Sequence, residues 1–370
     1  MFKTIFDSLV VSLDPKTAYW SSSPSKGWGR PESLLMGDVH YWGVWWGEQP
    51  FEMYKRKVGR FNSEFGFQSY PDYNTMLYFA DSTELYFGSP IVEAHQKHPR
   101  GTRQINDFIE KYFYTSSEFE QYVYASQLTQ LYGMQMAIDA QRSRMPRSMG
   151  SLYWQLNDSW PAVSWSSVDY FGRWKALHYG LRESFAPILL GMDTLEGKPN
   201  VIWVINESHR NLEVDLEVVV MDSQNVVSTM MHPLQVKHGE VVFVPTIFTP
   251  NVPDKINKNT SFIHLQLKEN QQVLAERLAY FVHPNELQLP KPDVMIRSVQ
   301  KDSFVELTIE SRTWVKNIQL LSNIDGHFDR NYFDMLPNKT YTVKFYPSKK
   351  LQTNALRFTY RSIYDLKSKR

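Results

Sequence analysis

The sequence predicts an α/β region followed by two small β-sandwiches. Up to about Pro187, short strand-like runs alternate with helical segments, which is typical of parallel sheets and barrels. Beyond Pro187, apolar and polar residues alternate in short runs, which is typical of antiparallel sandwiches. The chain has 370 residues, of which 42% are hydrophobic and 15% aromatic. This apolar content is sufficient for the cores of two or three domains.

The α/β region contains several strand and helix candidates. The strand candidates occupy residues 17–23, 34–42, 59–65 and 150–158. A long helix is predicted over residues 116–146, because apolar residues recur there at steps of three and four, and Ser116 or Ser117 is its expected cap. Amphipathic patterns predict further helices at residues 1–15 and 173–185. Four strand–helix units cannot close a (β/α)8 barrel, so this region is expected to be part of a larger fold.

The remainder of the chain has the pattern of antiparallel strands. Residues 211–223 alternate apolar with acidic side chains, which predicts a strand with one face in water. Further strands are predicted at residues 201–208, 240–248, 261–270, 274–282, 303–311, 317–322, 341–347 and 355–364. Residues 283–293 contain three prolines and are predicted to be a linker. The predicted domains are therefore residues 1–187, 188–284 and 285–370.

Charge, cysteine content and motifs exclude several function classes. Forty basic and 39 acidic residues give a formal net charge of +1, so nothing indicates a nucleic-acid or anionic-membrane partner. Cysteine is absent, which excludes disulfides, thiolate metal sites and a cysteine nucleophile. The sequence contains neither an apolar run long enough to span a membrane nor a zinc, nucleotide-binding or serine-hydrolase motif. We therefore expect no metal and no other cofactor.

A single carboxylate, Glu64, stands at the C-terminal end of a predicted strand in "GRFNSEFGFQSYP" and is followed by Gly66. Barrel enzymes carry their catalytic groups at this end of the strands. Residue pattern alone leaves open a second interpretation, in which Glu64 is a surface acid at a loop mouth.

The strand "GDVHYW" places Asp38, His40 and Trp42 on one face by alternation. Such a polar face suits a substrate pocket, although a tryptophan packed in the core beside a satisfied histidine fits the pattern equally well. In "SLYWQLNDSWPAVSW", Trp154 lies near a strand end with amides and an acid close behind it. Core packing is the default interpretation of a tryptophan, but a cluster of them beside acids and amides also indicates stacking on a sugar ring.

In chain order, the segments "SSPS", "GDVHYWGVWWG", "RFNSEFGFQSYP", "GSLYWQLNDSWPAVSWSSVDYFGRWKALHY" and "NYFDMLP" resemble the β-mannosidases of glycoside hydrolase family 2. The resemblance implies that residues 1–187 are the C-terminal half of a (β/α)8 TIM barrel and that the two sandwiches are immunoglobulin-like. It also implies that Glu64, in the "SEFG" motif, is the nucleophile of a retaining mechanism. Trp42 and Trp154 match aromatic residues of the mannose subsite.

The same resemblance implies three further contacts and a missing partner. Trp28 and Trp46 are expected to join the mannose subsite, with His40 as a polar neighbour of the nucleophile. The family's acid/base glutamate lies in an Asn-Glu pair upstream, in the first half of the barrel, and no such pair occurs in residues 1–187. Two acids in this region, Glu48 and Glu84, lie in predicted loops without a matching motif.

The expected substrate is therefore a terminal β-mannoside, and the expected partner is the N-terminal half of the enzyme. By resemblance, an exported or lysosomal location is favoured over the cytoplasm, with any signal peptide upstream of Met1. Two alternatives stay open at this point. One is a non-catalytic mannoside-binding or scaffold module, and the other is a family 2 β-galactosidase or glucuronidase specificity.

Overall fold

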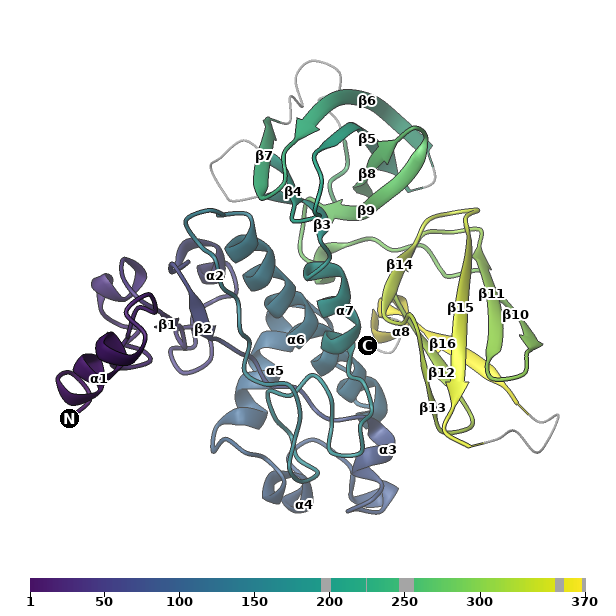
Figure 1. The fold of residues 1–370 in the computed structure, drawn as a ribbon. Helices are drawn as coiled ribbons and strands as arrows, with labels where there is room; N and C mark the ends of the chain where they lie inside the picture. The colour runs from purple at the N-terminus through teal and green to yellow at the C-terminus, as the bar shows by residue number, and fades with distance from the viewer. Residues whose placement is uncertain (194–200, 224, 246–255, 350–355, 368–370) are drawn as a thin grey trace.

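The computed structural model describes residues 1–193, 201–223, 225–245, 256–349 and 356–367 (Figure 1). The N-terminal part is mainly helical, and two groups of β-strands follow it. Figure 1 shows the strands β3–β9 above helices α6 and α7 and the strands β10–β16 beside them. No helix in these ranges is long and apolar enough to cross a membrane.

The N-terminal part is built from short strands and helices. In chain order they are α1 (Ile5–Leu13), η1 (Pro31–Leu34), β1 (Val39–His40), α2 (Met53–Arg56), β2 (Asn62–Glu64), α3 (Tyr73–Met76), η2 (Ser82–Glu84), α4 (Pro90–Ala94), α5 (Gly101–Tyr112), α6 (Phe119–Arg142) and α7 (Ala176–Ser184). Strands β1 and β2 pair in parallel, with His40 opposite Glu64. Asn62 forms a further parallel bridge with Ser151. Three chain segments therefore run side by side in the same direction.

The long helix α6 confirms the periodicity of the sequence, but its predicted cap is wrong. The N-cap residue is Glu118, which makes no side-chain capping hydrogen bond. Ser116 instead accepts a hydrogen bond from the Glu118 backbone N–H at 3.2 Å. Helix α7 also begins later than predicted, because Trp174 forms an antiparallel bridge with Val168 before the helix starts.

The strand predicted at residues 17–23 is wrong, because the structure shows no strand there. Residues 150–158 contain only an isolated bridge at Ser151 instead of a strand. Aromatic and β-branched residues favour a strand only where a neighbouring strand pairs with them. The described part of the chain provides no such ladder for residues 17–23.

The first group of strands forms a sandwich of two antiparallel sheets. The three-stranded sheet has the order β3-β4-β7, with β3 (Ile188–Asp193), β4 (Val201–Asn206) and β7 (Glu240–Pro245). The four-stranded sheet has the order β6-β5-β8-β9, with β6 (Asn225–Val236), β5 (Leu212–Asp222), β8 (Ser261–Glu269) and β9 (Gln272–Tyr280). The alternation predicted for residues 211–223 is confirmed, since β5 buries Leu212, Val214, Leu216, Val218 and Val220. The last residues predicted for the strand at 240–248 lie outside the described residues.

The second group of strands has its own core. One sheet has the order β10-β11-β15-β13, with β10 (Val294–Gln300), β11 (Val305–Ser311), β15 (Thr340–Pro347) and β13 (Gly326–Phe328). The other has the order β14-β12-β16, with β14 (Phe333–Met335), β12 (Val315–Ser322) and β16 (Phe358–Arg361). A short helix α8 (Ile363–Lys367) follows, and η3 (Pro284–Glu286) begins the proline-rich linker.

The three parts of the chain are packed together. The core of the helical part continues into the two sandwiches, where it includes Phe262, Trp314 and Tyr332. The Tyr124 hydroxyl of α6 donates a hydrogen bond to the Asn317 carbonyl of β12 at 2.5 Å. These contacts fix both sandwiches against the helices.

Lys175, just before α7, is completely buried, and this makes stability depend on pH. Its Nζ donates hydrogen bonds to the carbonyls of Ser69 at 3.2 Å and Ser164 at 3.4 Å. Burial lowers the pKa of Lys175 from 10.5 to about 7, although Asp158 and Asp169 partly oppose the shift. The unfolded chain therefore binds more protons than the folded chain between these two pKa values.

We expect the free energy of unfolding to rise with pH in that window, by about 1 kcal/mol per pH unit from this group. Below the folded pKa, both states carry the proton and the cost of burying the charge is greatest. Urea unfolding of the wild type and Lys175→Met at pH 7, 8 and 9 measures the effect as the difference between their slopes. Lys16→Met, at an exposed lysine, is the control and keeps the wild-type slope. Equal slopes for wild type and Lys175→Met would refute the assignment.

Candidate active site around Glu64

Glu64 is the last residue of β2, and the neighbouring strand orients its carboxylate. Its backbone carbonyl accepts a hydrogen bond from the Tyr41 N–H at 2.8 Å, which fixes the register between β1 and β2. Its side-chain Oε2 accepts a hydrogen bond from Trp42 Nε1 at 3.1 Å and lies 3.3 Å from His40 Nδ1. The side chain is 28% exposed, so the carboxylate is held by neighbours and still open to solvent.

Only one oxygen of Glu64 has these partners. Among the described residues, no hydrogen bond or ion pair engages Oε1. One oxygen is therefore fixed by two aromatic side chains, while the other is available to a ligand.

The residues behind His40 form a small polar network. Asp38 Oδ2 accepts hydrogen bonds from the hydroxyls of Ser23 and Ser63, each at 2.5 Å. Ser23 Oγ also lies 3.2 Å from His40 Nε2, and Asp38 Oδ2 lies 3.8 Å from the same nitrogen. The network engages Nε2 of the imidazole, while Nδ1 lies beside Glu64, so the ring has a polar partner at both nitrogens.

The alternation predicted for "GDVHYW" is present in the structure. Val39 and Tyr41 are buried in the core, whereas His40 and Trp42 contact Glu64. Local strand geometry therefore accounts for the convergence of these side chains.

Trp154 lies on the chain segment next to β2. Its backbone N–H donates to the Phe65 carbonyl at 2.8 Å, and its side chain is 44% exposed. Gly66 makes this approach possible, because a Cβ at that position would lie 2.2 Å from the Trp154 carbonyl oxygen. Trp42, which contacts Glu64, packs edge-to-face on Trp165, with ring centroids 6.3 Å apart.

Trp28 and Trp46 make no hydrogen bond with Glu64 and no ring contact with its partners among the described residues. Trp28 packs on Tyr41, with ring centroids 6.4 Å apart, and Trp46 packs on His98, with centroids 4.4 Å apart. Both indole rings are exposed. Their place in a substrate subsite stays a prediction.

The two other acids singled out in this region are engaged elsewhere. Glu48 Oε1 accepts hydrogen bonds from Arg100 at 2.6 Å and Arg103 at 2.8 Å. Glu84 accepts a hydrogen bond from the backbone N–H of Asp81 at 3.0 Å, as part of a capping box. Neither carboxylate contacts Glu64 or its partners in the described part of the chain.

Sequence reasoning did not select Ser23, Ser63 or Asp38 as site residues. Alternation along the strand did place Asp38 on the face of His40. Nothing in the sequence indicated that Ser23, which precedes the strand by many residues, returns to it. In the residues that the structure describes, no group of three or more histidines and acids is arranged to hold a metal ion.

Comparison with known proteins relates this geometry to a family. Residues 200–285 match the family described as "Mannosidase Ig/CBM-like domain", and residues 289–366 match one described as "Ig-fold domain". The crystal structure of β-D-mannosidase from Dictyoglomus thermophilum superposes with a TM-score of 0.85 and 25% identity, over 98% of this chain and 44% of that chain. The chain is related to the C-terminal portion of the β-mannosidases of glycoside hydrolase family 2.

Other relatives agree with this family 2 relationship. "Beta-mannosidase B" of Aspergillus flavus is 34% identical over 200 residues, covering 52% of this chain and 23% of the relative. "Beta-mannosidase B" of Aspergillus niger is 32% identical over the same length. The exo-chitosanase CsxA of Amycolatopsis orientalis has a TM-score of 0.67 at 14% identity, which shows a shared fold alone. The chain spans about a quarter of the length of these curated relatives, and its two sandwiches match the immunoglobulin-like domain families.

Proposed function

We propose that this chain is part of a retaining exo-β-mannosidase and that Glu64 is its nucleophile. The observation that carries the proposal is the carboxylate itself, which is 28% exposed, with Oε2 held by Trp42 and His40 and with no hydrogen bond or ion pair at Oε1 among the described residues. A nucleophile needs one oxygen fixed in direction and one oxygen exposed to the anomeric carbon. The proposed substrate is a terminal β-D-mannoside, as the relatives' names suggest.

In the proposed reaction, Glu64 Oε1 attacks the anomeric carbon and the bond to the leaving oxygen breaks. A second carboxylic acid protonates that oxygen, and the mannosyl group becomes esterified to Glu64. The second carboxylate then removes a proton from water, which attacks the same carbon, releases mannose and restores Glu64. Retaining enzymes place the two carboxyl groups about 5–5.5 Å apart.

We propose that the second carboxylate comes from an N-terminal half that this chain does not contain. Glu48 and Glu84 are bound to other groups, and the parallel array of β1, β2 and the segment at Ser151 has few strands. These features fit the C-terminal half of a (β/α)8 barrel over residues 1–187, followed by domains at 188–284 and 285–370. The partner half would supply the remaining strands together with the acid/base.

We propose that Trp154, Trp28 and Trp46 bind the sugar and that His40 and Trp42 orient Glu64. The exposed ring of Trp154 is suited to stack on the apolar face of a pyranose. His40 and Trp42 act on the reaction through Glu64 and are positioning residues as well as candidate subsite contacts.

Complementation tests this function. A chromogenic β-mannoside is incubated with the chain alone, with a separately expressed N-terminal half, and with the mixture. We expect turnover only in the mixture. Turnover by the chain alone would show that the acid/base is present after all. Mannose binding without turnover in every tube would favour the non-catalytic module instead.

The same assay addresses the related family 2 specificities. Chromogenic β-galactoside and β-glucuronide are offered to the complemented enzyme in parallel. Faster turnover of either substrate than of the β-mannoside would replace the proposed substrate and leave the role of Glu64 standing.

A further inference from the structure

A cavity of about 940 Å³ lies where the helical part meets both β-sandwiches. Its walls come from α2, α6 and α7, from β3 and β9, and from β12 with the segment before β14. None of Trp28, His40, Trp42, Trp46, Glu64 or Trp154 lines it. Ligand sites are typically about 300–1,000 Å³ in volume and are frequent at domain interfaces. The cavity is therefore separate from the Glu64 cluster and large enough for a ligand.

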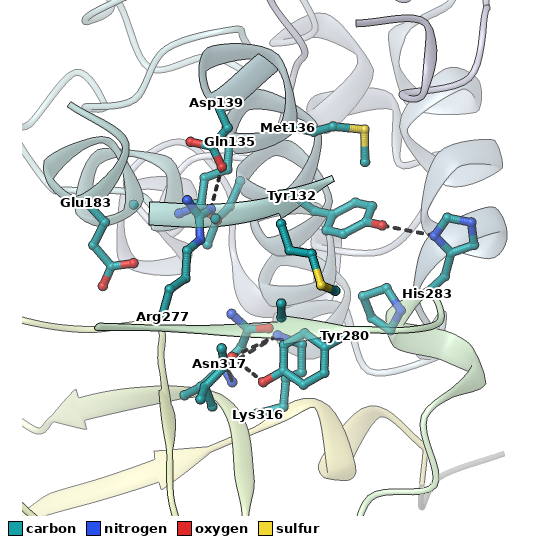
Figure 2. A pocket seen from close by; sticks show the side chains of 18 of the residues that line it. Tyr132, Gln135, Met136, Asp139, Glu183, Arg277, Tyr280, His283, Lys316 and Asn317 are labelled. Carbon is teal, nitrogen blue, oxygen red and sulfur yellow. Dashed lines mark hydrogen bonds and ion pairs between the residues drawn. The ribbon is translucent and has the colours of Figure 1, made fainter. Parts of the chain in front are cut away.

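Most charged groups in the cavity wall are already paired. Figure 2 shows Arg277 reaching from β9 to Asp139 of α6, an ion pair with 2.5 Å between Nη2 and Oδ2. Lys316 Nζ lies 3.1 Å from Asp334 Oδ2, which also accepts a hydrogen bond from Tyr280. These pairs cancel much of the local charge, so the cavity does not present one sign to a ligand.

A few polar groups in the wall lack a hydrogen-bond partner. Asp139 Oδ1 is buried and has no hydrogen-bond partner. In the described part of the chain, no hydrogen bond or ion pair engages the Glu183 carboxylate, which faces the cavity in Figure 2. Arg330 has its guanidinium over the Phe333 ring, 4.4 Å from the centroid, and no ion pair within the described ranges. The Oδ1 atom of Asp139, the Glu183 carboxylate and the Arg330 guanidinium are therefore among the groups of the described wall that can bond to a ligand.

These free groups lie close enough to interact. The positive charges of Arg330 and Arg277 act on the Glu183 carboxylate. A ligand with a net positive charge would meet these two guanidinium groups, and one with a net negative charge would meet Glu183 and Asp139. A neutral ligand with several hydroxyls can instead donate to the carboxylates and accept from the guanidinium.

Two tyrosines, one from the helical part and one from the first sandwich, also line the cavity. Tyr132 of α6 lines the cavity and its hydroxyl lies 2.9 Å from His283 Nδ1 (Figure 2). Tyr280 of β9 also lines it, but its ring is stacked on Trp314 with centroids 5.7 Å apart and has Lys316 Nζ 4.0 Å from its centroid, so its faces are already occupied. An aromatic ring such as that of Tyr132 can pack against the C–H face of a pyranose ring.

We propose that this cavity is a second carbohydrate-binding site, which takes a neutral mono- or disaccharide and holds it between the helices and both sandwiches. Hydroxyls of the sugar donate to Glu183 and Asp139 and accept from Arg330, and Tyr132 contacts its ring. The site requires no catalysis by Glu64, so it stands or falls independently of the proposed function.

Calorimetric titration of the purified chain with mannobiose tests the proposal, with lactose and cellobiose as further neutral disaccharides. We expect Glu183→Gln to weaken binding about tenfold, as for the loss of a charge-assisted hydrogen bond. Met136→Trp fills the cavity from α6 and is expected to abolish binding. The matched controls are Glu213→Gln on the wet face of β5 and Met149→Trp at an exposed methionine, and both are expected to bind as the wild type does.

Trp154→Ala separates this site from the Glu64 cluster. Binding that survives Trp154→Ala and disappears in Met136→Trp supports the cavity site. Binding lost in Trp154→Ala and kept in Met136→Trp would overturn the inference and leave the proposed function intact. Absence of binding by all three disaccharides, or binding of putrescine in their place, would also overturn it.

Discussion

Glu64→Gln is expected to reduce turnover of β-mannosides by the complemented enzyme by about 10⁴-fold or more, as for other nucleophile removals. The amide nitrogen replaces a carboxylate oxygen, so no negative charge remains to attack the anomeric carbon. The shape of the side chain and its place beside Trp42 and His40 are retained. Folding should be unaffected, and substrate binding should persist.

The measurement is single-turnover and steady-state hydrolysis of a chromogenic β-mannoside. Glu213→Gln, on the exposed face of β5, is the matched control and should keep wild-type rates. Glu64→Ala adds a second test, because azide can enter the vacated space and form a mannosyl azide of inverted configuration. Unchanged turnover in Glu64→Gln, or no azide product in Glu64→Ala, would assign the nucleophile to another residue.

Gly66→Ala is expected to lower the free energy of unfolding by about 2 kcal/mol or more, as for an overpacked core. The added Cβ would lie 2.2 Å from the Trp154 carbonyl oxygen and 3.2 Å from Trp165 Cδ1. The first of these atoms belongs to the backbone and cannot rotate away. The Gly66 carbonyl is also held by the Tyr54 hydroxyl at 3.1 Å, so neither segment can yield cheaply.

Urea denaturation of the wild type and Gly66→Ala measures this loss directly. Gly27→Ala is the control, because a Cβ at Gly27 meets nothing within 4 Å, and its stability should change by less than about 0.5 kcal/mol. The clash also pushes Trp154 away from β2, so activity in the complemented enzyme should fall together with stability. Wild-type stability in Gly66→Ala would show that the close approach is not a constraint.

Local periodicity predicted the strongly patterned elements well. Strand β5 buries one face along most of its length, and its sequence carries a clear period of two. Helix α6 is buried on nearly all sides, and its length and its spaced apolar residues made it predictable. Strands β6 and β10 were not predicted. Both lie at sheet edges and leave most of their residues at least partly exposed. Because neither strand has a fully buried face, its sequence does not need to alternate apolar with polar residues.

The candidate site was only partly predictable for a similar reason. Asp38, His40 and Trp42 share a strand, and alternation alone places them on one face. Ser23 reaches the same cluster from a distant loop, and Asp139 meets Arg277 across the junction with the first sandwich. Contacts between distant segments depend on packing that no short window of sequence contains.

The sequence by itself determined the α/β-then-β organisation, the position of Glu64 at a strand end and the resemblance to family 2 β-mannosidases. These follow from local patterns and from motifs whose residues are close together in the chain. Only the tertiary structure decided which oxygen of Glu64 is held, why residue 66 must be glycine, and that charged and aromatic side chains from three parts of the chain enclose a cavity. Each of these depends on distances between segments far apart in sequence, and those distances are set when the cores of the three parts pack together.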